Sequence, residues 1–204
     1  MIQRAKHQSA YAERFACGRG DALVVVDVQK DFLPGGALAV PGGEEIIDPL
    51  NRFLDKFSRL GLPIFATRDW HPRSHCSFRE KGGPWPAHCV AATPGARFAE
   101  GLRLPSRSVV VSKASDPSRD ACSGFDGTDL DARLRKAGVR RLVIGGLSTE
   151  YCVRATALGA LVRGYSVSVI EDAVRALDPG GGRRALDELA EKGAVLLRSE
   201  AAAV

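Results

Sequence analysis

The 204-residue sequence lacks any apolar run near the ~20 residues that a membrane-spanning helix needs, so we expect no membrane association. It also has no secretory hydrophobic segment at its start. Its five cysteines are an odd number and widely separated, which disfavours a disulfide framework. We therefore expect free thiols in a reducing compartment, the cytoplasm.

Two further motifs are missing. The formal net charge is +5, but the basic residues are scattered and form no block interleaved with aromatic residues. This distribution is typical of a solvated surface and disfavours a nucleic-acid partner. No G-x-G-x-x-G motif follows the first apolar run, which disfavours a dinucleotide-binding oxidoreductase.

What the chain does contain is an alternation of short apolar runs and amphipathic segments. The runs are nearly unbroken Val, Ile and Leu, as in strands covered on both faces: 22–27, 62–69, 108–113, 141–146, 165–172 and 194–199. Helices are predicted between them, several ending at glycine, near 44–60, 129–137, 150–163 and 180–192. The order predicts a three-layer α/β fold with a six-stranded, mostly parallel sheet and helices on both faces.

The alternation also sets the domain limits. We interpret residues 1–20 as an N-terminal extension and residues 21–204 as one domain. The interval 70–107 does not fit the alternation, because it is rich in Pro and Gly, holds both tryptophans and is too long for a simple connection. We expect it to be a functional loop.

Ionisable residues end the first three predicted strands, namely Asp27, Asp69 and Lys113. Ligands of open parallel sheets bind beyond the carboxyl ends of the strands, so these side chains should meet at one edge. The alternative is that a chain leaving the apolar core becomes polar without any functional reason. This explanation is sufficient for each of the three residues taken singly.

Cys152 follows the fourth predicted strand in LVIGGLSTEYCVRATAL, a pattern of strand, glycine turn and helix. Ser148 or Thr149 could cap the helix. Near a helix N-terminus, unpaired N–H groups and the dipole favour a thiolate, and Lys113 would lower its pKa further. Asp27 could accept or return the proton. The alternative is a small buried hydrophobic residue, the usual role of a free cysteine.

Three of the four histidines lie in the long loop. Asp69 and His71 are two positions apart and so face the same side of an extended strand end. With His88 they offer one carboxylate and two imidazoles to Zn²⁺, Fe²⁺ or Mn²⁺, leaving positions open for water or substrate. We place His75 beside these ligands as a supporting group. The alternative is a hydrogen-bonded turn, since Asp-x-His alone is a weak signal.

Several segments together, in order and spacing, resemble the isochorismatase-like hydrolases over about residues 20–200: VVVDVQKDFLPGG, TRDWHPRSHCSF, GPWPAHCV, VSKASDPSRDACSGFDGTDL and RLVIGGLSTEYCVRATAL. Within that family the resemblance is closest to the nicotinamidase branch. It implies a Rossmann-like fold and a hydrolase that converts nicotinamide, or pyrazinamide, to the acid and ammonia. The sequence departs from the usual pattern at Ser148, Glu150 and Cys122, where Ala, Asp and an aromatic residue are common.

The resemblance also implies a role for each site residue. The implied catalytic residues are Asp27, Lys113 and Cys152, with Cys152 forming a thioester. A cis peptide between Leu147 and Ser148 is implied, with the backbone N–H groups of Ser148 and Cys152 as the oxyanion hole.

The resemblance further implies which residues bind one metal ion and which bind the substrate. One divalent ion, zinc before iron or manganese, is implied on Asp69, His71 and His88, and a pyridine ring between Phe32 and Trp85. A homo-oligomer is compatible with the sequence.

Three other functions remain open from the sequence. Relatives with the same Asp-Lys-Cys set hydrolyse isochorismate or carbamoyl and ureido amides, reactions that have no ring nitrogen for a metal to bind. A zinc-stabilised binding protein without catalytic activity is the third, and it leaves the Asp27, Lys113 and Cys152 set unexplained.

Overall fold

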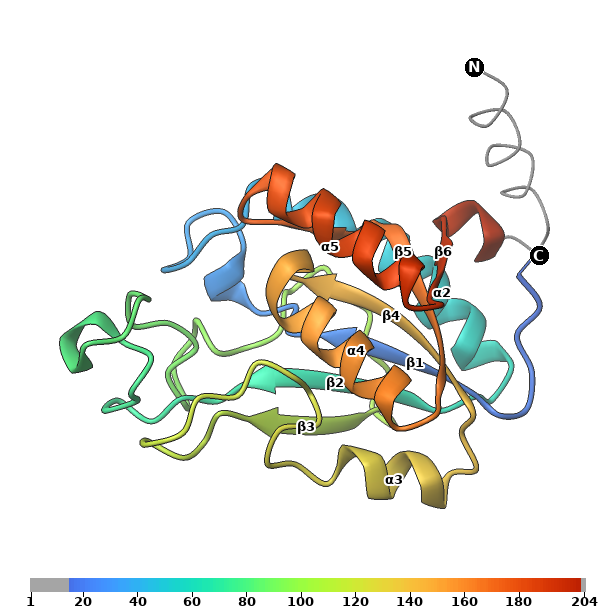
Figure 1. Cartoon of the computed structure of the whole chain (residues 1–204), viewed down its shortest axis with the longest axis horizontal. Helices are drawn as coiled ribbons and strands as arrows, with labels where there is room; N and C mark the ends of the chain where they lie inside the picture. Colours follow the sequence, from blue (N-terminus) through green and yellow to red (C-terminus); the bar gives the residue numbers. More distant parts are fainter. Residues whose placement is uncertain (1–14, 203–204) are drawn as a thin grey trace.

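The computed structural model describes residues 15–202 and has three layers, with helices on both sides of one sheet (Figure 1). The six strands pair in parallel throughout, in the order β3-β2-β1-β4-β5-β6. They are β1 (Asp21–Val26), β2 (Ile64–Asp69), β3 (Val109–Lys113), β4 (Arg141–Leu147), β5 (Ser166–Arg175) and β6 (Val195–Leu197). The predicted α/β fold is confirmed.

The helices are α2 (Ile47–Arg59), α3 (Leu130–Lys136), α4 (Arg154–Val162) and α5 (Pro179–Glu191). Each ends within one or two residues of a glycine with positive φ, as the sequence predicts. Two predicted helices begin with a different kind of turn, a 3₁₀ turn at Gly43–Ile46 before α2 and a π-helical turn at Thr149–Val153 before α4.

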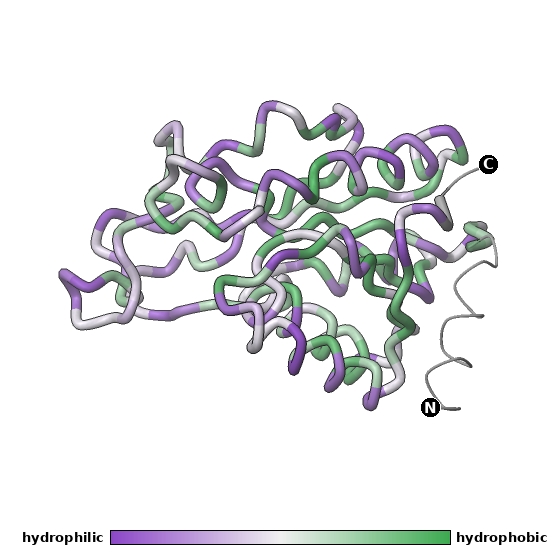
Figure 2. Tube along the Cα trace, turned by 90° about the horizontal axis from the view of Figure 1, so that it is seen from above, coloured by the Kyte–Doolittle hydropathy of each residue, from purple (hydrophilic) through white to green (hydrophobic). Residues whose placement is uncertain are grey.

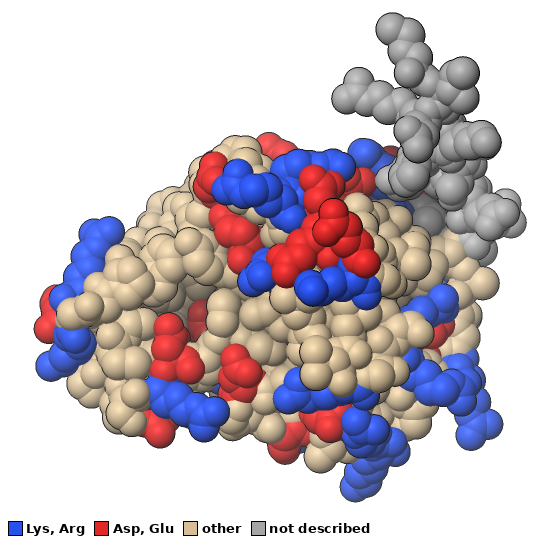
Figure 3. Space-filling model, in the orientation of Figure 1, with Lys and Arg blue, Asp and Glu red and all other residues tan. Residues whose placement is uncertain are grey.

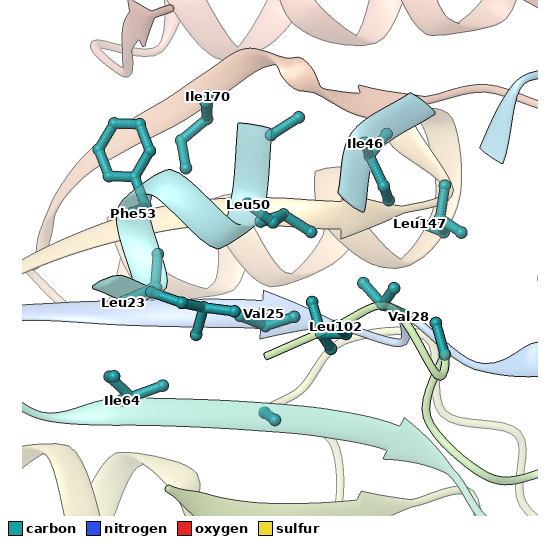
Figure 4. Packing of buried hydrophobic residues seen from close by; sticks show 14 of the residues in the cluster. Leu23, Val25, Val28, Ile46, Leu50, Phe53, Ile64, Leu102, Leu147 and Ile170 are labelled. Carbon is teal, nitrogen blue, oxygen red and sulfur yellow. The ribbon is translucent and has the colours of Figure 1, made fainter. Parts of the chain in front are cut away.

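Two apolar clusters hold the layers together. Along β1, Leu23 and Val25 belong to the cluster under α2, whereas Val24 and Val26 belong to the cluster under α3, α4 and α5. Figure 4 shows Leu23 and Val25 of β1 below Phe53 and Leu50 of α2. The apolar strands run through the centre of the molecule in Figure 2. Each fully buried aliphatic side chain contributes about 1.5–3 kcal/mol to stability.

The N-terminal segment, the surface charge and the helices can each be compared with the sequence predictions. Residues 1–14 of the predicted extension lie outside the described residues, but Phe15 packs on Phe53 with 6.4 Å between ring centroids. Acidic and basic side chains are mixed on the face shown in Figure 3. Among residues 15–202, no helix combines the length and the apolar character required to cross a membrane.

The sheet order creates a crevice beside β1. The chain continues from β1 to β2 and β3 on one side and returns to β4 on the other, so the connections diverge at the carboxyl ends of β1 and β4. Gly146 permits the close approach of these strands, because its φ is +138° and a Cβ there would lie 2.0 Å from the carbonyl oxygen of Val26.

The long loop 70–107 extends from the same edge of the sheet (Figure 1). It contains one short 3₁₀ turn, Arg79–Lys81. One isolated bridge joins it to the segment after β1, Gln29 to Phe98, and two lie within the loop, His71 to Val90 and Phe78 to Trp85. The loop therefore brings distant residues to the crevice without regular secondary structure of its own.

Candidate active site

Lys113 is the centre of the ionisable group at the carboxyl edge of the sheet. Its buried Nζ lies 3.0 Å from Asp27 Oδ2, 2.5 Å from Asp69 Oδ1 and 3.5 Å from Cys152 Sγ. It also donates a hydrogen bond to the carbonyl oxygen of Ala121 at 3.1 Å. The parallel register places Asp69 directly opposite Lys113, which explains why the two strand ends meet. The sequence prediction of one shared edge holds for these four side chains.

The charged side chains of this group shift one another's pKa values. Burial alone would lower the pKa of Lys113, but the carboxylates of Asp27 and Asp69 raise it well above its ordinary value. Burial likewise opposes ionisation of Asp69, yet Lys113 and His71 hold its pKa below the usual range. Lys113 is therefore an ammonium beside a carboxylate.

Asp27 has a different environment. Burial raises its pKa to about 6, against the opposing effect of Lys113. Its Oδ1 accepts a hydrogen bond from the Thr67 hydroxyl at 2.7 Å. Its Oδ2 pairs with the Lys113 ammonium at 3.0 Å and has no further partner in the described part of the chain, and a carboxylate oxygen of Asp27 lies within 4.8 Å of Cys152 Sγ. A carboxyl group with this pKa can exchange a proton with a neighbouring thiol near neutral pH.

Cys152 has a neighbour that the sequence did not predict. Its Sγ lies 3.9 Å from Cys122 Sγ, and the two thiols share a hydrogen bond. That bond and burial raise the pKa of Cys152 well above its ordinary value, although Lys113 acts in the opposite direction. Lys113 lowers this pKa as expected, but the neighbouring thiol and burial outweigh its effect. Cys152 keeps its proton until a base removes it, a role that suits Asp27.

The turn that carries Cys152 also differs from the expectation in detail. Ser148 occupies the N-cap position, but its side chain makes no capping hydrogen bond and the first turn is π-helical. Its carbonyl oxygen instead accepts from the N–H groups of Tyr151 and Val153. The Leu147–Ser148 peptide is cis, as the resemblance implies, and both Ser148 and Cys152 border the pocket.

Three side chains form a compact group of metal-ligand type. One atom from each of Asp69, His71 and His88 lies within 4.8 Å of the others, and all three side chains are buried. The Nδ1 atoms of both histidines face carbonyl oxygens: His71 that of His88 at 3.0 Å, and His88 that of Pro86 at 2.8 Å. Burial lowers the pKa of His71 to about 4, so the ring is neutral. Two imidazoles with anchored Nδ1 atoms and one carboxylate fit a divalent ion.

His75 packs behind this group, with its ring centroid 4.4 Å from that of His71. Its Nδ1 pairs with the Ser77 hydroxyl at 2.7 Å, and its Nε2 lies 3.3 Å from the carbonyl oxygen of Arg119. Both ring nitrogens thus have protein partners, an arrangement suited to supporting the ligand residues. His75 also belongs to a second possible ligand group, with His71 and the exposed Asp120.

A pocket of about 510 Å³, including its open mouth, joins these parts. Its lining includes Phe32, Asp69, His71, Trp85, His88, Cys122, Ser148, Tyr151 and Cys152. Phe32 lies against His88, with 5.5 Å between ring centroids, and Trp85 meets Tyr151 edge-on at 5.2 Å. The pocket therefore has aromatic walls, a thiol, and a group of metal-ligand type.

Sequence reasoning missed three residues that shape this site. Gln29 bonds the backbone of Asp69, Asp31 accepts from the N–H of Cys89 at 2.7 Å beside His88, and Tyr151 stands at the pocket mouth. A signal existed for Gln29 and Asp31, because both are polar residues in the short segment that follows the apolar strand β1. Nothing in the local pattern distinguishes Tyr151 from other helix residues.

Residues 21–201 match the family described as the isochorismatase domain. The chain belongs to this family. The nicotinamidase of Escherichia coli (strain K12) is 36% identical to it over 198 residues, which cover 86% of this chain and 93% of the relative.

Two solved structures extend the likeness to the fold of this isochorismatase-family chain. A pyrazinamidase of Pyrococcus horikoshii in complex with zinc has a TM-score of 0.86 and 52% identity, covering 88% of this chain and 99% of that one. PnC1 from L. infantum in complex with nicotinate has a TM-score of 0.84 and 38% identity, covering 90% and 94%.

Proposed function

We propose that this protein is a metal-dependent amidohydrolase that converts nicotinamide to nicotinate and ammonia, as in NAD salvage. The observation that carries the proposal is one pocket lined by both Cys152 and the three residues of metal-ligand type. The nicotinamidase relative and the structure with nicotinate support the substrate.

Asp69, His71 and His88 would hold one divalent ion, zinc before iron or manganese. Zinc is also named in the P. horikoshii pyrazinamidase structure. A bound ion supplies a Lewis-acid site for the ring nitrogen, directly or through water. Phe32 and Trp85 would hold the faces of the pyridine ring, which directs the carboxamide toward Cys152.

Acylation begins when Cys152 Sγ attacks the carboxamide carbon while Asp27 takes the thiol proton. The backbone N–H groups of Ser148 and Cys152 stabilise the oxyanion. Asp27 returns the proton to the departing ammonia, leaving a thioester on Cys152. Its pKa of about 6 suits both directions of this transfer.

Deacylation requires water to attack the thioester carbon. Asp27, ionised again, accepts a proton from that water and gives it to the sulfur of Cys152 as the C–S bond breaks, and the acid that forms ionises to nicotinate. Lys113 stays charged throughout and holds both carboxylates in place, because its Nζ contacts Asp27 and Asp69 together.

Ammonia release by the purified, zinc-loaded protein tests the reaction. Nicotinamide should be hydrolysed much faster than an N-carbamoyl amino acid or isochorismate. Faster turnover of either alternative would replace the proposed substrate. Acid-quenched protein should carry a nicotinoyl group on the tryptic peptide 142–154, which contains Cys152, and an adduct elsewhere would contradict the thioester.

A further inference from the structure

A second thiol lines the pocket beside the proposed nucleophile. Cys122 and Cys152 are both half-buried, and their sulfur atoms are 3.9 Å apart. A disulfide needs about 2.05 Å, so the two sulfurs must approach by about 1.9 Å. Cys122 lies between β3 and α3 in a segment that is neither helix nor strand.

The other cysteines do not share this arrangement. Cys89 is completely buried, and Cys17 packs on the side of the core under α2. Neither these two nor Cys76 line the pocket in the described part of the chain. The Cys122–Cys152 pair is therefore the thiol pair that a small molecule in the pocket meets.

We propose that Cys122 and Cys152 form a peroxide-reactive pair that closes into a reversible disulfide across the pocket. The mechanism of hydrolysis makes no use of Cys122. This oxidation goes beyond the proposed function, and its chemical readout does not depend on any amide substrate.

The first step is the attack of Cys122 on a hydroperoxide. Its sulfur bonds to the terminal oxygen, the O–O bond breaks, and the remaining oxygen leaves as an alcohol or water after taking a proton. Cys122 becomes a sulfenic acid, oxidised by two electrons that the peroxide gains. Cys122 lines the pocket with its sulfur 3.9 Å from that of Cys152, so a hydroperoxide in the pocket can reach it and the sulfenic acid forms beside a second thiol.

The second step joins the two sulfurs. Cys152 attacks the sulfenic sulfur, the S–O bond breaks, and the hydroxyl leaves as water with the Cys152 proton. The net change is two thiols and one hydroperoxide giving a disulfide, an alcohol and water. The disulfide removes the nucleophile, and a dithiol restores it.

Peptide mapping of the zinc-loaded protein after hydrogen peroxide treatment tests the proposal. Under non-reducing conditions, the tryptic peptides 120–133 and 142–154 should appear joined, with two hydrogen atoms fewer than the separate pair. Reduction should separate them and restore turnover. A disulfide to Cys76 or Cys89, or a sulfinic acid on Cys152 with Cys122 unmodified, would overturn the proposal.

Cysteine variants test the proposed disulfide independently. Cys122→Ser removes the thiol assigned to the first attack and should lose activity to peroxide more slowly, whereas Cys17→Ser should lose and recover activity as the unmodified sequence does. An equal rate of loss in Cys122→Ser would contradict the pair. In Cys152→Ser the sulfenic acid on Cys122 has no partner, so dimedone should label it; no label would overturn the assigned order of attack.

Discussion

The side-chain amide of Gln29 closes two hydrogen bonds on the backbone of Asp69. Its Oε1 accepts from the Asp69 N–H and its Nε2 donates to the Asp69 carbonyl, both at 2.8 Å. Nε2 also donates to the carbonyl oxygen of Ala96 at 3.0 Å. One buried amide thus fixes the residue that contacts both Lys113 and the two histidines of the ligand group.

Replacing Gln29 with Ala should therefore weaken metal retention. Loss of these bonds leaves buried backbone groups unpaired and frees Asp69 to shift, with a stability cost of about 1–3 kcal/mol. Metal content after dialysis against a chelator should fall, as measured by elemental analysis.

Asn51→Ala is the matched control. Asn51 is also a buried amide with two backbone partners, Gly101 at 2.9 Å and Arg103 at 2.8 Å, but it lies on α2 away from the ligands. It should lose similar stability in urea denaturation and keep its metal. Equal metal loss in both variants would show that Gln29 acts through general stability.

The contrast between Asp27 and Gln29 shows how far the sequence could predict this site. Asp27, Asp69 and Lys113 follow from position alone, because each ends an apolar run and parallel strands end at one edge. The partner of Gln29 lies forty positions away on the backbone of another strand, so no local pattern reveals the bond.

The turn around Cys152 shows a different limit. The strand, the glycine turn and the following helix were predictable from composition. The π-helical start was not, because its hydrogen bonds depend on how the chain enters from Ser148. The proximity of Cys122 was equally hidden, since a loop residue thirty positions away carries no periodicity that fixes its place.

Cys152→Ala should reduce nicotinamide turnover by several orders of magnitude, because no other group in the mechanism can form the acyl intermediate. Steady-state ammonia release measures this loss. Cys17→Ala serves as the comparison, since Cys17 packs against the core rather than the pocket, and it should keep most activity. Substantial hydrolysis by Cys152→Ala would rule out covalent catalysis.

Activity should fall as the pH drops below about 6. Asp27 must be ionised to take the thiol proton, and burial raises its pKa to about 6, so protonation removes the base on the acidic side. A plot of kcat/KM against pH should lose about tenfold per unit there. Asp21→Asn changes the opposite end of β1, where Asp21 pairs with Arg141, and should keep the same profile. A profile flat through that range would remove Asp27 from this role.

Lys113→Met should destabilise the metal-free protein by about 3–5 kcal/mol. The substitution leaves the buried carboxyl groups of Asp27 and Asp69 without their cation, and the pKa of Asp27 should rise further. Lys30→Met removes a partly exposed partner of the exposed Glu100 and should cost far less stability, because solvent screens that pair. Urea denaturation compares the two, and equal costs would mean that Lys113 is not the electrostatic centre of the site.

The choice between nicotinamide and benzamide tests whether a metal orients the substrate or only supports the loop. Nicotinamide and pyrazinamide carry a ring nitrogen meta to the carbon that bears the carboxamide, and benzamide has the same shape without it. Misplacement of a substrate by about an ångström can cost ~10²-fold in rate, so benzamide should be hydrolysed far more slowly. His71→Ala, or chelation, should lower the rate and also remove the preference between the two amides. Equal kcat/KM for both amides in the zinc-loaded protein would assign Asp69, His71 and His88 a structural role.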